Sequence, residues 1–302
     1  MARRLTYFIL TAAGLGVLFL GWNAWRNSRN LSDTEMLKRL PTNDAVVLSI
    51  NFAQLRHSGI FGELVGSKVM EEAEYQAFVR DSGFDYKRDL DNVLASFAPA
   101  GNFFVLRGRF DWNRLQAYAK QSGGSCYNEL CGMPGSQPDR RISFVPLSRE
   151  VMGLAVTTSD SAASQMLQAS AQRPISVPLQ PIWMLMSGSA LGRSTKNLPG
   201  GNLLGSALTS VDEMLLTIGA QGDAFAAHME AQCKTSQDAV NLNGQLKALT
   251  GLLKGAMERE KKTPDTRNLT GVLTAGQFHQ TDRVVYGEWT LQKAFLDSLA
   301  GM

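Results

Sequence analysis

A long uncharged segment near the N-terminus constrains this chain more than any other feature. It runs from Leu5 to Trp22, and arginines flank it on both sides. A helix needs about twenty apolar residues to cross the hydrocarbon core of a bilayer, and extension of the segment to Trp25 supplies that length. We therefore predict a signal anchor over residues 1–29, with a transmembrane span at about residues 5–25. The residues expected to contact the bilayer are Leu5, Phe8, Leu15, Leu20, Trp22 and Trp25, with the tryptophans at the interface.

Two other interpretations of this segment stay open. A cleaved secretory signal also combines a short basic start with an apolar stretch. The segment is longer than a typical signal core, and no A-x-A-like cleavage site follows it before the charges resume, which favours retention. A buried helix of a soluble domain is the third interpretation, and apolar residues on every side of the segment argue against it.

The length of chain on each side of the anchor indicates its orientation. A four-residue tail precedes the span and one large domain follows it, which is the layout of a signal anchor with its N-terminus inside. We expect a single-pass protein of the bacterial inner membrane with a periplasmic, extracytoplasmic C-terminal domain. Its expected partners are the lipid bilayer and either another envelope protein or an apolar ligand.

The anchor also accounts for the positive charge of the chain. The net charge is +3, from 30 basic and 27 acidic residues. Four of the arginines lie within residues 1–29, which contain no acid, so the rest of the chain has 26 basic and 27 acidic residues and a net charge of −1. Because nucleic-acid binding requires clustered basic residues, we expect no nucleic-acid partner.

Two cysteines lie close together in a stretch rich in glycine and serine. Cys126 and Cys131 form a C-x4-C pair that can close a small disulfide ring, worth about 2 kcal/mol for a loop of about six residues. Such a bond persists only in an oxidising compartment. Metal binding is the alternative, but it requires two more soft ligands nearby. Cys233 ends the alternating apolar face of a strand, so we expect it to be a buried, unreactive thiol.

The remaining pattern predicts an α+β fold with two similar halves. After a linker at residues 30–43, the first half covers residues 44–177 and the second covers residues 178–302, with prolines marking the boundary. Each half has the predicted order strand, helix, hairpin, helix, hairpin, helix, and the repeat rests on this order because residue identity between the halves is slight. We expect two mainly antiparallel sheets, each with helices on one face.

Individual segments carry clear signals within this order. Runs of β-branched and apolar residues predict the strands, and spacings of three and four predict the helices. The strongest helix follows a cap at Thr235 or Ser236. The predicted strands are 45–52, 93–98, 102–107, 142–145, 151–157, 182–187, 213–219, 224–232 and 284–289, with Phe278 in a partner strand. The predicted helices are 61–82, from Asp111 onward, 162–171, 202–210, from Thr235 onward, and 291–299.

Several short motifs resemble those of a known group. Leu40-Pro41 precedes the first strand of the domain, and Ser82-Gly83-Phe84-Asp85-Tyr86 precedes Asp89-Leu90-Asp91. Together with the anchor, these motifs resemble uncharacterised bacterial membrane-anchored proteins, acidobacterial ones in particular. The resemblance implies an extracytoplasmic location and a similar fold, and it implies no activity.

We find no motif for catalysis, cofactor binding or metal binding. The three histidines are scattered, and neither a nucleophile motif nor a phosphate-binding glycine loop is present. Asp85, Asp89 and Asp91 suggest a calcium loop, but its glycine and closing glutamate are missing, so helix capping and solvation explain them better. The glycines between Gly188 and Gly205 suggest a long loop or a mobile lid.

Two classes of function remain open. The first is a non-enzymatic binding or scaffold protein of the cell envelope, for which the methionine-rich strand Trp183–Met186 offers an adaptable surface. The second is an extracytoplasmic hydrolase that uses dispersed carboxylates such as Asp111 or Glu288. Because no catalytic motif is present, we expect the first class, without enzymatic activity, cofactor or metal.

Overall fold

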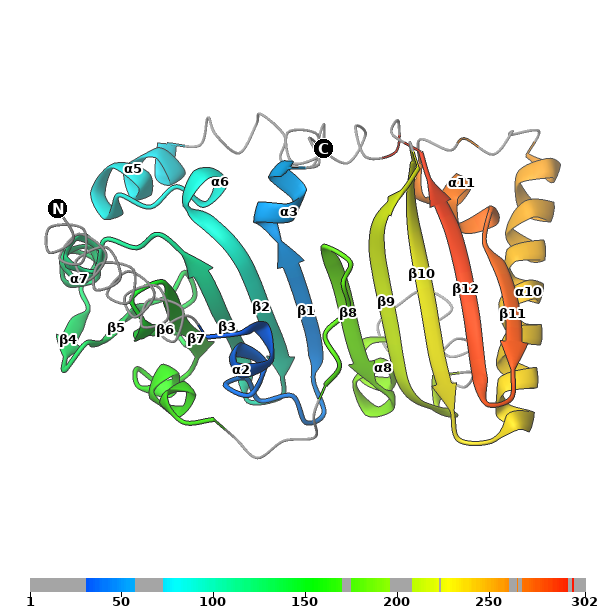
Figure 1. Cartoon of the computed structure of the whole chain (residues 1–302), viewed down its shortest axis with the longest axis horizontal. Coiled ribbons are helices and arrows are strands. Elements are labelled where there is room, and N and C mark those ends of the chain that lie inside the picture. The colour runs from blue at the N-terminus through cyan, green and yellow to red at the C-terminus, as the bar shows by residue number, and fades with distance from the viewer. Residues whose placement is uncertain are drawn as a thin grey trace, which may run out of the picture.

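A single antiparallel sheet dominates the computed structural model of the chain (Figure 1). The structure describes residues 31–57, 73–169, 175–195, 208–222, 224–260, 265, 268–292 and 295. Its 12 strands lie in the order β11-β12-β10-β9-β8-β1-β2-β3-β7-β6-β5-β4. The strands are β1 (Val46–Asn51), β2 (Leu90–Ala98), β3 (Gly101–Gly108), β4 (Ser125–Tyr127), β5 (Leu130–Pro134), β6 (Arg141–Ser148), β7 (Val151–Thr157), β8 (Ile182–Ser187), β9 (Val211–Gln221), β10 (Ala224–Cys233), β11 (Gln277–Thr281) and β12 (Val284–Leu291).

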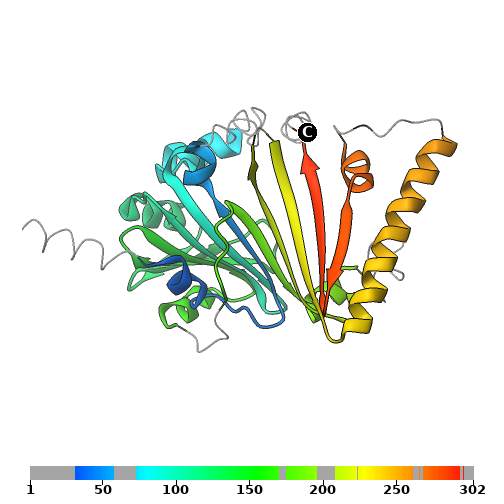
Figure 2. The same cartoon turned by 45° about the vertical axis from the view of Figure 1, so that its right-hand side comes forward.

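Helices pack on both faces of this sheet (Figures 1 and 2). The helices are α2 (Asp33–Leu37), α3 (Phe52–His57), α5 (Ala73–Ser82), α6 (Tyr86–Asp89), α7 (Trp112–Gln121), the 3-10 helix η2 (Ala162–Leu167), α8 (Gly188–Thr195), α10 (Ser236–Arg259) and α11 (Leu269–Thr274). We call the sheet face that packs against α2 and η2 the α2 face. The opposite face, which packs against α7, α8, α10 and α11, is the α10 face.

The expected mixed α+β architecture with antiparallel hairpins is present, but the prediction of two separate sheets is wrong. Strands of residues 44–177 and strands of residues 178–302 meet where β1 pairs with β8. Hydrogen bonds between these two strands make the sheet continuous. The expectation of helices on one face alone is also wrong, because α2 and η2 cover the face opposite to α7.

The core of the first half lies mainly under α2 and η2. Met36 and Leu40 pack there with Leu94, Val105 and other inward-facing strand residues. The prediction that residues 30–43 form a linker is wrong, because α2 lies within them and packs on the sheet. Ser32 and Glu35 form a capping box that starts α2, and the apolar side chains that follow are buried in the sheet.

The α10 face has three further clusters of buried side chains. One joins α7 to the strands near the disulfide, and another joins α8 and α10 to β9, β10 and β12. The third joins α11 to the same end of the sheet through Val272 and Leu291. Helix α10 begins at Thr235, whose side chain forms a capping box with Asp238, so the predicted cap is confirmed.

Some sequence-based expectations fall on parts of the chain that the structure does not describe. The predicted anchor, including Leu5, Phe8, Leu15, Leu20, Trp22 and Trp25, lies outside the described residues, as do residues 58–72 and most of the predicted last helix. Within the described part of the chain, no helix has the length and apolar character needed to cross a membrane. The prediction of a long loop between Gly188 and Gly205 is wrong for its first part, because Gly188–Thr195 forms α8.

Candidate functional site

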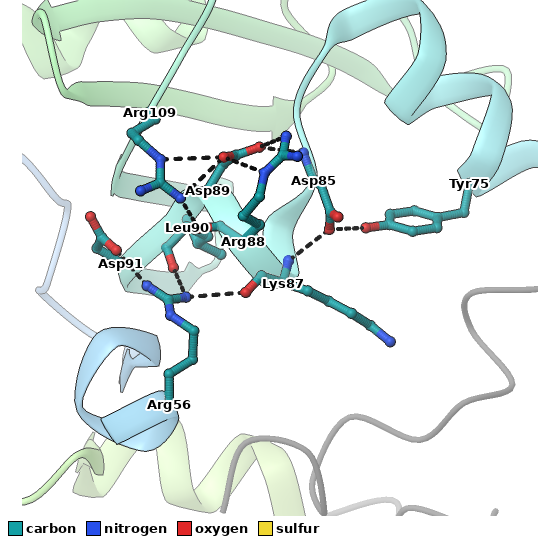
Figure 3. A network of polar contacts seen from close by, with 9 residues as sticks. All are labelled: Arg56, Tyr75, Asp85, Lys87, Arg88, Asp89, Leu90, Asp91 and Arg109. Carbon is teal, nitrogen blue, oxygen red and sulfur yellow. Dashed lines mark hydrogen bonds and ion pairs between the residues drawn. The ribbon is translucent and has the colours of Figure 1, made fainter. Parts of the chain in front are cut away.

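A network of charged side chains surrounds the short helix α6 (Figure 3). Asp85 caps this helix: its carboxylate accepts from the Lys87 N–H at 3.0 Å and from the Tyr75 hydroxyl at 2.8 Å. Burial and the hydrogen bond to Asp85 raise the pKa of Tyr75. The predicted capping role is confirmed for Asp85, but the expected solvation is wrong for Asp89, which is buried.

Asp89 is the buried member of the same network. Its carboxylate accepts from Arg88, Arg109 and the Asp85 N–H. Burial alone would raise the pKa of Asp89, but the hydrogen bonds from Arg88 and the Asp85 backbone, together with nearby positive charge, lower it.

The third carboxylate of the motif has a different partner. Asp91 accepts from Arg56 Nη2 at 2.5 Å, while Arg56 Nη1 donates to the Leu90 carbonyl. The three aspartates therefore point to separate partners and do not converge on one point (Figure 3). No three His, Cys, Asp or Glu side chains of the described residues are grouped to hold a metal ion. This network holds α6 to its surroundings.

The predicted disulfide is present between Cys126 and Cys131. The two residues lie directly opposite each other in the hairpin of β4 and β5. The bond therefore joins β4 to β5, and the packing of the buried Cys131 against Leu115 and Ala119 holds this hairpin against α7. Cys233 is a buried free thiol, as expected, and burial raises its pKa.

Asp111 and Glu288, the carboxylates named for a hydrolase, lie far apart. Asp111 caps α7 by accepting from the Arg114 N–H at 3.1 Å. Glu288 lies on β12, and five strands separate β12 from β3, which leads to α7. At about 4.8 Å per strand the two carboxylates are on the order of 30 Å apart, so they cannot act on one bond.

The histidines are less scattered than the sequence indicates. His57 lies on α3, where its Nδ1 contacts the Ala53 carbonyl at 2.6 Å. His228 of β10 and His279 of β11 share the α2 face, with β12 between them. The His279 ring stacks on Tyr286 with centroids 4.9 Å apart. Only the strand register brings these two histidines to one face.

A contiguous apolar surface occupies the centre of the α10 face. On β1, Val46, Leu48 and Ile50 point to this face, and the paired positions of β2 and β8 continue it. Phe97 is 40% exposed and its ring meets Phe104 edge-on at 6.1 Å. We call this surface the central apolar patch. Its members are Val46, Leu48, Ile50, Val93, Phe97, Phe104, Val156, Ile182 and Met184.

The central apolar patch differs from the packed parts of the described sheet. Its side chains are half-buried or exposed, and they join none of the clusters of buried side chains found among the described residues. Exposed contiguous apolar surface marks binding sites more often than chance, whereas single exposed apolar residues are ordinary. Of the strand Trp183–Met186 that was expected to offer an adaptable surface, Met184 lies in this patch, whereas Trp183 is buried in the core under α2.

A groove of about 560 Å³ lies on the opposite, α2 face, next to the β8–β9 pair. Its wall includes Ile175 and Ser176, and the buried Trp183 lies at its base. Its other lining residues are Leu185, Asp212, Glu213, Leu215, Glu230, Gln232, Arg283, Val284 and Tyr286.

No protein-family model matches the chain, and no curated protein matches it in sequence. Solved structures similar to it include crystal forms III and IV of TP0453, each with a TM-score of 0.50. Form III is 12% identical and covers 88% of this chain and 98% of its own, while form IV is 13% identical and covers 92% and 99%. At these identities, the likeness concerns the fold alone.

Proposed function

We propose that this protein is a non-catalytic binding or scaffold protein of the bacterial cell envelope and that its central apolar patch is the binding surface. The observation that carries the proposal is the patch itself: Leu48, Phe97 and their neighbours form a contiguous apolar surface outside the described core clusters. Leaving apolar area in water costs about 25 cal/mol per Å², so a partner that covers the patch gains that free energy. The partner is an apolar ligand or an apolar segment of another envelope protein.

The location belongs to the same proposal. The uncharged segment Leu5–Trp22 supports a single-pass anchor in the inner membrane with the sheet on the periplasmic side. The disulfide Cys126–Cys131 supports an oxidising compartment. The resemblance of the motifs around Leu40 and Asp85 to those of acidobacteria-like membrane-anchored proteins supports the same location.

We further propose that the two halves arose by duplication. From the β1–β8 pair outward, the order β1-β2-β3-β7-β6 on one side matches β8-β9-β10-β12-β11 on the other. In both series the first strand is followed by a hairpin, and the outer two strands form a second hairpin. A pseudo-twofold relation between the halves would place the central apolar patch across the axis.

Photo-crosslinking at Phe97 tests the binding function. An aromatic photo-crosslinking residue replaces Phe97 in the full chain within bacterial cells, and the same residue at Tyr127 is the control. Tyr127 is 80% exposed but lies on the edge strand β4, away from the patch. We expect a discrete adduct from Phe97 and none from Tyr127, and its mass distinguishes a protein partner from a small ligand. Failure of Phe97 to form an adduct, or the same adducts at both positions, would refute the proposal.

A further inference from the structure

We propose that the central apolar patch binds a helix of another envelope protein, through a stripe of apolar side chains spaced three and four residues apart on that helix. This inference rests on the proposed binding function and names the chemistry of the partner. The patch lies mainly on β8, β1, β2 and β3, the middle strands of the sheet (Figure 1).

Described helices pack on both sides of the patch. Towards β7, Leu106 and Leu154 pack against the cluster under α7. Towards β9, Leu216 packs against the cluster that joins α8 and α10 to the sheet. Among the described residues, none of the three clusters on this face includes a side chain of β1 or β2. The helix layer formed by the described part of the chain is therefore interrupted over these two strands.

The size of the patch matches one short helix. With strands about 4.8 Å apart, β8, β1, β2 and β3 are about 14 Å across, and Val46 to Ile50 is about 14 Å along the strand. A helix with its side chains is about 10–12 Å wide and rises about 1.5 Å per residue, so about nine residues cover the patch.

Helix α10 shows how this face of the sheet binds a helix. Its side chains Ala239 and Leu242 are 0% and 1% exposed, and they pack on β10 and β12 with Leu246 one turn further along. These positions are three and four residues apart, which places them on one side of the helix. We expect the partner helix to use the same spacing.

An extended segment fits the patch poorly. Strand β1 pairs with β2 on one side and with β8 on the other, so a further strand cannot be added there. A strand laid over the apolar side chains would bury its own backbone N–H and C=O groups without partners. A helix satisfies these groups within itself. The sheet edges, where a strand could be added, are β4 and β11, far from the patch.

Charge also restricts the occupant. None of the patch residues is charged, and the charges near the two ends of β1 are paired. Asp44 accepts from Arg193 Nη1 at 2.5 Å at one end, and Asp91 accepts from Arg56 Nη2 at 2.5 Å at the other. Because an unpaired charge is costly to bury, the side of the partner that faces the patch must be uncharged.

Two other occupants fit less well. A second copy of the chain that presented its own patch would meet α7 and α10 on both sides. These helices, about 10 Å or more in diameter, would hold the two sheets further apart than the distance of about 10 Å at which sheets pack. A small apolar ligand is usually enclosed by a concave site, whereas the patch extends over several strands.

Photo-crosslinking at three positions of the full chain in bacterial cells tests the helix. An aromatic photo-crosslinking residue replaces Phe97, Phe104 or Ile182 in turn, and mass spectrometry identifies the partner residue that each captures. The rings of Phe97 and Phe104 are 6.1 Å apart, so their captured residues should be three or four apart in the partner sequence. Phe97 is opposite Val46 and Ile182 is opposite Ile50, at the two ends of the patch.

The separation between these two ends distinguishes a helix from an extended segment. Residues captured from Phe97 and Ile182 should be about seven to eleven apart if the partner is helical, and about four apart if it is extended. In the chain that carries the crosslinker at Phe97, Met184→Lys should lower the adduct yield about tenfold, because its charge would face an apolar stripe. Leu179→Lys is the matched control, since Leu179 is 91% exposed and lies outside the patch.

The outcomes separate this inference from the proposed function. Adducts with residues about four apart, adducts with the mass of a small ligand, or crosslinked pairs of this chain would leave the binding function standing and overturn the helix. Equal loss of yield from M184K and L179K would also overturn it. Absence of any adduct at Phe97 would contradict the binding function, and this inference with it.

Discussion

Val47 of β1 lies directly opposite Leu185 of β8, in the antiparallel pair that joins the two halves of the sheet. The neighbouring pair is Ser49 and Trp183, both buried on the α2 face. Trp183 packs into the cluster under α2, although its own strand belongs to the second half of the chain. The seam between the halves is therefore part of the hydrophobic core.

Trp183→Ala should destabilise the whole sheet. The side chain is 2% exposed and is the largest of the fully buried side chains described. Its loss should lower the free energy of unfolding by about 3–5 kcal/mol. Urea unfolding followed by far-ultraviolet circular dichroism measures this. Tyr127→Ala removes an exposed aromatic side chain and should change the free energy by less than about 0.5 kcal/mol. Equal effects of the two substitutions would show that the seam is not packed.

The sequence predicts much of this local structure, because short-range patterns encode it. The hairpins of β2 with β3 and of β6 with β7 follow from apolar runs separated by turn residues. The cap at Thr235 follows from its own side chain and that of Asp238. Helix α2 was missed, although Ser32 and Glu35 carry the capping-box signal, because it has only 5 residues.

The periodicity of apolar residues does not predict which strands pair when they are far apart in the sequence. Alternation along β1 shows which residues share a face, but it does not show that β8 is its neighbour. The prediction of two sheets failed for this reason. The same limit applies to the central apolar patch: Val46, Phe97 and Met184 are each an ordinary apolar position in the sequence. They form one surface only once β1, β2 and β8 are in register.

The Cys126–Cys131 disulfide should be stabilising but not essential. The C126S/C131S variant should unfold with a free energy lower by about 2 kcal/mol, since the ring is small. In cells, neither cysteine should react with a thiol reagent until reductant is added. Cys233 should react only after unfolding, because burial raises its pKa and excludes the reagent. Full labelling of Cys126 and Cys131 without reductant in freshly isolated cells would contradict the extracytoplasmic location.

Asp89 should make stability depend on acid pH. Its pKa in the folded state is lower than the ordinary value of 3.8, so folding favours the ionised form. The stabilisation is complete above that ordinary value and is lost as pH falls through the lower folded pKa. Asp89→Asn should cost about 1–3 kcal/mol at pH 7, because a buried hydrogen-bonded carboxylate is removed.

Urea unfolding at several pH values tests the role of Asp89. The difference in unfolding free energy between wild type and D89N should be constant from pH 7 to pH 5 and should shrink below about pH 4. Asp81→Asn removes an exposed carboxylate paired with Arg80 and should cost less than about 1 kcal/mol at pH 7. A D89N difference that stays constant down to the lowest pH would show that the folded-state pKa of Asp89 is not lowered.

Two substitutions of Asp111 distinguish a capping role of its carboxylate from a catalytic role. Asparagine caps a helix about as well as aspartate, whereas alanine does not, so D111N should match wild type and D111A should lose about 1 kcal/mol of stability. A catalytic carboxylate would be lost in both variants. Unfolding in urea measures the cap, and a panel of ester, peptide and glycoside substrates measures activity with the same full-length proteins. Turnover by wild type that both D111N and D111A abolish would assign Asp111 to catalysis and overturn the binding-protein proposal.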